Sequence, residues 1–131
     1  MENYIGHIVV CEEVFQGPDG APVLSKPLGM LTPISLPSNY SFTISIGFIN
    51  LRKKNTYKAL VKLTDAEGKE AINQGIEFNI DDDNNPGATA YSVFNINCRN
   101  VVLRNAGNYI VSVSMNEEEK MLTLPVVIQG S

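Results

Sequence analysis

Apolar and polar side chains alternate along most of this chain, the pattern of β-strands that bury one face. The clearest stripe covers residues 40–48, where every second residue is aromatic or isoleucine and the residues between are small or polar. A second stripe follows over residues 57–63. No segment of useful length has the helical period of 3.6 residues. The pattern therefore predicts an all-β protein.

Turn residues divide the alternating pattern into about eight predicted strands. Gly17 to Gly20 and Asp65 to Gly68 have the composition of tight turns. The stretch 22–37 contains four prolines, and each removes a backbone donor, so it is either an edge strand or a meandering connection. Pro125 makes the last strand an edge strand or an interrupted one. The clearest strands are expected at 5–15, 40–48, 57–63, 69–80, 88–98, 109–115 and 121–128.

The segment Leu103 to Val113 predicts how these strands are connected. A turn with Gly107 precedes Tyr109, which opens an alternating strand. In immunoglobulin-like sandwiches such a tyrosine buries its ring and donates its hydroxyl to the preceding turn. We therefore expect one domain over residues 1–131, an immunoglobulin-like two-sheet antiparallel β-sandwich with Greek-key connections. The expected core is Phe42, Ile44, Ile46, Phe48, Ala59, Val61, Leu63, Phe94, Ile96, Tyr109, Val111 and Val113.

Four segments together resemble a loose group of small bacterial and prophage proteins of uncharacterised function with a β-sandwich fold. The first is Ile8-Val9-Val10-Cys11-Glu12, and the second runs from Leu28 to Pro37. The others are the strand pair from Tyr57 to Gly68 and the closing Gly107-Asn108-Tyr109-Ile110-Val111. The resemblance implies a β-sandwich and favours a prophage origin, and it assigns no catalytic or binding residue.

Charge and hydropathy exclude several classes of function. The net charge is −4, which argues against nucleic-acid binding, because that affinity comes largely from neutralised phosphates. No run approaches the ~20 apolar residues that cross a bilayer, so no membrane association is expected. The first residues lack the features of a signal peptide. We therefore expect a location in the cytoplasm or on a phage particle.

The run Asp81-Asp82-Asp83 is the best candidate for a metal site, because calcium prefers clustered oxygen ligands. Counted from Asp81, the sixth residue is Pro86 and the twelfth is Ser92, so the calcium loop of paired-helix proteins is not matched. Three adjacent aspartates are more typical of a solvated loop. No cofactor is expected.

Catalytic signals are weak, and we expect no enzyme. The single histidine, His7, has no partner nearby in sequence and is more typical of a packed or surface side chain. Cys11 and Cys98 could pair, but distant cysteines in an unexported chain are more often free buried thiols. Arg99 beside Cys98 would lower the pKa of that thiol only in a suitable geometry.

The basic run Arg52-Lys53-Lys54 connects two predicted core strands at one end of the sandwich, where such folds bind partners. It could meet an acidic protein, or simply keep the sheet soluble. Our leading hypothesis is a non-enzymatic protein-binding or accessory module that uses loops at this end. One alternative is a structural subunit or homo-oligomer that assembles through an edge strand, such as 121–128. The other is a calcium-dependent surface or carbohydrate-binding module.

Overall fold

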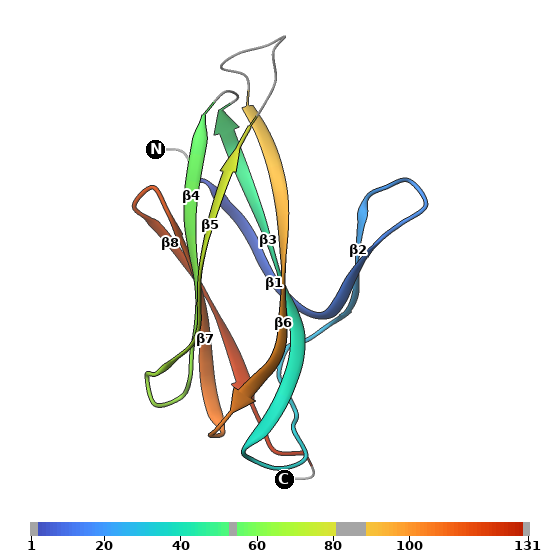
Figure 1. The fold of residues 1–131 in the computed structure, drawn as a ribbon, viewed down its shortest axis with the longest axis vertical. Coiled ribbons are helices and arrows are strands. Elements are labelled where there is room, and N and C mark those ends of the chain that lie inside the picture. The colour runs from blue at the N-terminus through green and yellow to red at the C-terminus, as the bar shows by residue number, and fades with distance from the viewer. Residues whose placement is uncertain (1–2, 53–54, 81–88, 130–131) are drawn as a thin grey trace.

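The computed structural model describes residues 3–52, 55–80 and 89–129, and the regular elements of these residues are all β-strands. Among them there is no helix that could cross a membrane. The strands, labelled in Figure 1, are β1 (Ile5–Gln16), β2 (Pro22–Pro27), β3 (Ser38–Arg52), β4 (Thr56–Thr64), β5 (Glu70–Asn79), β6 (Thr89–Leu103), β7 (Gly107–Met115) and β8 (Glu118–Val126).

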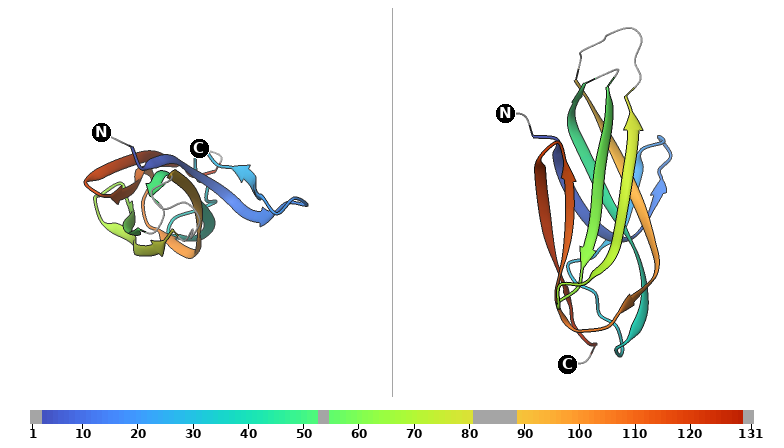
Figure 2. Two further views of the ribbon diagram at one scale, coloured as in Figure 1. Left: turned by 90° about the horizontal axis from the view of Figure 1, so that it is seen from above. Right: turned by 60° about the vertical axis from the view of Figure 1, so that its left-hand side comes forward.

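The strands form two four-stranded sheets, with the orders β2-β1-β3-β6 and β5-β4-β7-β8. Neighbouring strands within each sheet are antiparallel. The two sheets pack face to face (Figures 1 and 2). The predicted two-sheet antiparallel β-sandwich is therefore confirmed, while its immunoglobulin-like and Greek-key details stay a prediction.

The predicted stripes form the core between the sheets. Of the expected core side chains all are buried except Phe94, which is half-buried and packs against the others. The rings of Phe48, Phe78 and Phe94 contact one another, with centroids 4.7–5.9 Å apart. This confirms the alternation over β3, β4 and β7, because each of these strands contributes every second side chain to the core.

The corner between β6 and β7 has the predicted tyrosine bond. The Tyr109 ring is fully buried, and its hydroxyl donates to the Asn105 carbonyl at 3.0 Å. The Asn105 Oδ1 accepts a hydrogen bond from the N–H of Ala66 in the β4–β5 turn. Gly107 has φ +130°, and a Cβ there would lie 2.8 Å from the Ala66 Cβ. The corner is therefore packed directly against the neighbouring turn.

The last strand was expected to begin at residue 121, with the polar run 116–120 as the loop before it, and this prediction is wrong. Asn116 and Glu117 both have positive φ, 50° and 67°, which gives a two-residue hairpin turn, and β8 already begins at Glu118. The Glu118 carboxylate does not lie at a solvated tip. It accepts the backbone N–H groups of Tyr4 at 2.6 Å and Ile5 at 3.2 Å, and so joins the start of β8 to the start of β1.

The proline-rich stretch 22–37 contains both of the predicted alternatives, since the edge strand β2 is followed by a connection. Within that connection Leu31 is fully buried. Its N–H donates to the Pro125 carbonyl at 2.8 Å, and its carbonyl accepts from the Val127 N–H at 2.9 Å. The connection thus joins the end of β8, and β8 is the predicted edge strand with Pro125 inside it.

Candidate functional site

A two-stranded arm projects from the sandwich (Figures 1 and 2). Strand β1 pairs with β3 only as far as Cys11, and from there to Gln16 it pairs with β2 alone. The turn at the tip is closed by the Gly17 N–H, which donates to the Ala21 carbonyl at 2.8 Å. Residues 12–27, which we call the arm, therefore extend beyond the sheet that carries them.

Each face of the arm carries an apolar cross-strand pair. Val14 lies opposite Leu24, and Phe15 lies opposite Val23 on the other face. Phe15 is 51% exposed and Val23 39% exposed. A two-stranded hairpin by itself is marginally stable in water. Exposed apolar side chains on such an arm are typical of a surface that a partner covers.

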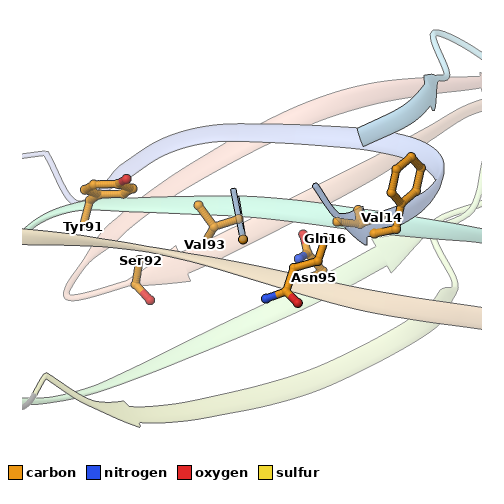
Figure 3. Close-up of a pocket in the computed structure, with 8 residues that line it drawn as sticks. Val14, Gln16, Tyr91, Ser92, Val93 and Asn95 are labelled. Atoms are coloured by element: carbon orange, nitrogen blue, oxygen red, sulfur yellow. The ribbon is translucent and has the colours of Figure 1, made fainter. Parts of the chain in front are cut away.

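An open groove separates the arm from the outer face of β6 (Figure 3). Val14, Phe15 and Gln16 line it on the arm, and Tyr91, Val93 and Asn95 line it on β6. Its volume is about 780 Å³, and no charged side chain lines it. The Tyr91 side chain at its border is 76% exposed. The groove therefore offers aromatic and aliphatic contacts and has no charged wall.

Strand β3, the neighbour of β6, is tightly packed on its outer face. Thr43 and Ser45 of β3 are fully buried there, and the Thr43 hydroxyl donates to Asn97 Oδ1 at 3.0 Å. A Cβ at Gly47 would collide with the His7 imidazole, so the His7 ring packs over this glycine. His7 is thus an exposed surface side chain whose ring lies over Gly47, one of the two alternatives that the sequence indicated.

The four edge strands differ in how they are protected from pairing with another chain. Natural edge strands usually carry charges or prolines, which discourage such pairing. Three edges here follow that rule, with Pro22, Lys26 and Pro27 on β2, Glu70 and Glu77 on β5, and Glu118, Glu119, Lys120 and Pro125 on β8. Strand β6 has neither a charge nor a proline from residue 89 to residue 98. It is the unprotected edge.

The strand ends that flank the two predicted site runs lie together at one end of the sandwich. Arg52 pairs with Thr89, and Thr56 pairs with Asn79, which places the ends of these strands together. The Arg52 N–H donates to the Tyr57 hydroxyl at 2.7 Å. Lys53 and Lys54, predicted to bind a partner, lie outside the described residues. So do Asp81, Asp82 and Asp83, the candidate metal ligands.

The two cysteines are free and buried, as the sequence favoured. Cys11 is on β1 and Cys98 on β6, and β3 lies between these strands. Burial raises the pKa of the Cys98 thiol to about 11, although nearby Arg99 acts in the opposite direction. Burial also raises the pKa of Cys11. Both thiols are therefore protonated near neutral pH and are poor nucleophiles.

Within residues 3–52, 55–80 and 89–129, no three His, Cys, Asp or Glu side chains gather in a way that could hold a metal ion. A second surface depression, of about 560 Å³, lies between β5 and β6. Its acidic and basic side chains, such as Asp65, Glu70, Arg99 and Arg104, are mixed. This depression shows no dominant charge that would select a ligand.

Sequence reasoning missed the arm and the groove. A signal was present, because Val14-Phe15 and Val23-Leu24 place apolar residues on both faces of two strands joined by a short turn. A two-stranded hairpin with apolar residues on both faces exposes some of them to water unless other parts of the protein cover both faces. Tyr91 and Val93 give β6 the same signal, because they alternate with the core residues Phe94 and Ile96.

Comparison with known proteins gives a family but no activity. Residues 7–129 match the sequence model of DUF6941, a family of unknown function. No curated protein matches the chain. The match agrees with the resemblance to uncharacterised proteins and contains no information on a prophage origin.

Proposed function

Because the chain belongs to DUF6941, a family of unknown function, we propose its role from its own surface: a non-enzymatic module that binds a protein partner in the groove between the arm and β6. The partner would contribute an uncharged, largely apolar segment, since the groove has no charged wall. As an accessory protein of prophage origin, which the sequence resemblance favours, it would act by holding another protein.

One observation supports this proposal most directly. Three large apolar side chains, Phe15, Val23 and Tyr91, are 39–76% exposed and lie on the arm or on the strand facing it. Monomeric proteins rarely expose apolar side chains in such a group unless they bind something there. Aromatic side chains also dominate the binding energy of protein interfaces. The open shape suits a protein segment better than a small molecule, which is usually enclosed.

The predicted contact through Arg52, Lys53 and Lys54 has less support. Only Arg52 of this run lies in the part of the chain that the structure describes, where its backbone N–H donates to the Tyr57 hydroxyl. The contact through this run stays a prediction.

Two variants of the groove test the proposal. Phe15→Ser and Tyr91→Ser each remove an exposed apolar anchor, and Met121→Ser on β8 is a matched control, because Met121 is also exposed, at 59%. Tagged proteins would be used to capture partners from the native host, with quantification by mass spectrometry. We expect each groove variant to lose the partner by at least about tenfold, which corresponds to the ~1.4 kcal/mol of a moderate anchor. Met121→Ser should retain it.

The opposite result would remove the proposal. If both groove variants and the control capture the same proteins in the same amounts as the wild type, the groove is not the binding site. A circular dichroism spectrum of each variant shows that the fold is intact. Loss of the partner with Met121→Ser alone would place the contact on β8 instead.

A further inference from the structure

Strand β6 is a free sheet edge. It pairs with β3 on one side only, so alternate N–H and C=O groups point away from the sheet along the other side. No backbone hydrogen bond joins this outer side of β6 to any other described segment. Such a row of donors and acceptors is a template on which another extended chain can pair.

Charge indicates which chain can approach this edge. The protein carries a net charge of −4, so two copies repel each other over most of their surface. The other three edges carry charged side chains, whereas residues 89–98 of β6 carry none. The β6 edge is therefore where two acidic copies can meet without bringing like charges together.

A bulge limits the length of the edge that can pair. Tyr40 pairs with Val101 and Phe42 with Cys98, so two residues of β6 stand opposite Ser41 alone. Asn100 has φ +53°, and its N–H donates to the Ser41 hydroxyl at 3.0 Å. A bulge of this kind bends the strand and ends regular pairing. The usable edge thus ends at about Arg99.

We propose that two copies of this chain associate by antiparallel pairing of their β6 strands about a two-fold axis at Asn95, which joins the two β2-β1-β3-β6 sheets into one. In this register Asn95 lies opposite Asn95 of the second copy. Val93 lies opposite Asn97 of the second copy, and Tyr91 lies opposite its Arg99. The two-fold axis makes the Val93–Asn97 and Tyr91–Arg99 pairs occur twice, while the Asn95 pair lies on the axis and occurs once.

The register brings together two side chains that are exposed in a single copy. Tyr91 is 76% exposed, and Arg99 is exposed and forms no ion pair with any described acidic side chain. Opposite each other, the guanidinium and the ring form a cation–π contact. The pairs on this face bring no like charges together, which is the requirement for stable cross-strand neighbours.

Association in solution is the first test. Sedimentation velocity of the wild type from about 1 µM to about 500 µM should show a reversible dimer. Asn95→Lys places two ammonium groups directly opposite each other on the axis and should weaken the dimer by at least about tenfold. Gln74→Lys adds the same charge to an exposed residue of the β5 edge and should leave the dimer unchanged. A monomer over the whole range, or equal dimers for both variants, would overturn the proposal.

Cysteine cross-linking tests the register. Directly opposed residues of antiparallel strands have Cα atoms about 4.5–5.5 Å apart, within the range of a disulfide. Asn95→Cys should therefore form a covalent dimer on mild oxidation. Val93→Cys alone should not, because the two copies of residue 93 would be about 14 Å apart along the paired strands. Mixing Val93→Cys with Asn97→Cys should give a mixed disulfide.

The wild type is the background control, since its two thiols are buried. Equal cross-linking of Asn95→Cys and Val93→Cys would refute the two-fold axis at Asn95. The proposed pairing shares Tyr91, Val93 and Asn95 with the groove, whereas Phe15 and Val23 on the arm take no part in it. A Phe15→Ser protein that loses its partner yet still dimerises would separate the two.

Discussion

Tyr109 holds the β6–β7 corner through both ends of its side chain. The ring is fully buried between the sheets, while the hydroxyl donates to the carbonyl of Asn105. Asn105 is in turn bonded to the β4–β5 turn through Ala66 and Glu67. A single residue thus couples the core to a network of surface turns, because its side chain is long enough to reach both.

We expect Tyr109→Phe to lower the free energy of unfolding by about 1 kcal/mol, the usual net contribution of one hydrogen bond. The ring would stay in place, and only the Asn105 carbonyl would lose its donor. Urea denaturation followed by circular dichroism measures the change. Tyr91→Phe is the control, because Tyr91 is 76% exposed and should give no change. Equal stability of the two variants would show that the Tyr109 hydroxyl bond contributes nothing.

Among single residues, those in a regular alternating strand were predictable. The burial of Ile44 and Val61 follows from the pleat, which is a local property of the backbone. The bond of Glu118 to the start of β1 was not predictable, because the two segments are 114 residues apart in sequence. In the sequence Glu118 is one of three equivalent glutamates, and only the fold brings it beside the Tyr4 N–H.

At the scale of elements, the arm is the part that contributes least to the core. Of the side chains that the structure describes from residue 12 to residue 30, none belongs to the buried core. The arm leaves the sheet because β1 is longer than the part of β3 that pairs with it. An element of this kind can serve binding without taking part in folding.

Replacing residues 13–25 by an Asn-Gly turn should therefore change the free energy of unfolding by less than about 1 kcal/mol. The same variant should lose the partner, because it lacks one wall of the groove. Urea denaturation and partner capture measure the two effects. For comparison, Phe42→Ala in β3 should cost about 3–5 kcal/mol, since Phe42 is fully buried. A comparable loss in the shortened arm would make the arm part of the folding unit.

Strand positions were predicted better than strand ends. The prediction of β8 began three residues too late, at 121 instead of 118. The cause is the turn at Asn116 and Glu117. Because both residues have positive φ, the hairpin turns with two residues, whereas the polar run 116–120 suggested a loop of five. Polar composition marks where a turn lies but does not determine how many residues it uses, because that depends on the backbone conformation.

At the scale of the whole molecule, the connection between β2 and β3 links one sheet to the other. Leu31 lies outside the named strands, yet it is fully buried and its backbone bonds to Pro125 and Val127 at the end of β8. Gln129 continues this contact through its N–H, which donates to the Pro33 carbonyl at 2.8 Å. The connection between β2 and β3 of the first sheet is thereby joined to the edge of the second sheet.

We expect Leu31→Ala to lower the free energy of unfolding by about 2–5 kcal/mol, the range for a fully buried leucine. Its neighbour Met30 is 47% exposed, so Met30→Ala should cost no more than about 0.5 kcal/mol. Thermal and urea unfolding of both variants would measure the difference. Similar losses for the two would mean that the connection moves away from β8 and does not belong to the core.

The sequence alone determined that this protein is built from two β layers around the stripes of β3, β4 and β7, because a pleated strand turns successive side chains to opposite faces. The tertiary structure decided the rest. Strand order placed the uncharged residues 89–98 of β6 at a sheet edge, let the end of β1 leave the sheet as an arm, and buried Leu31 beside the end of β8. These features arise from contacts between residues distant in sequence, and local periodicity carries no information about which strands become neighbours.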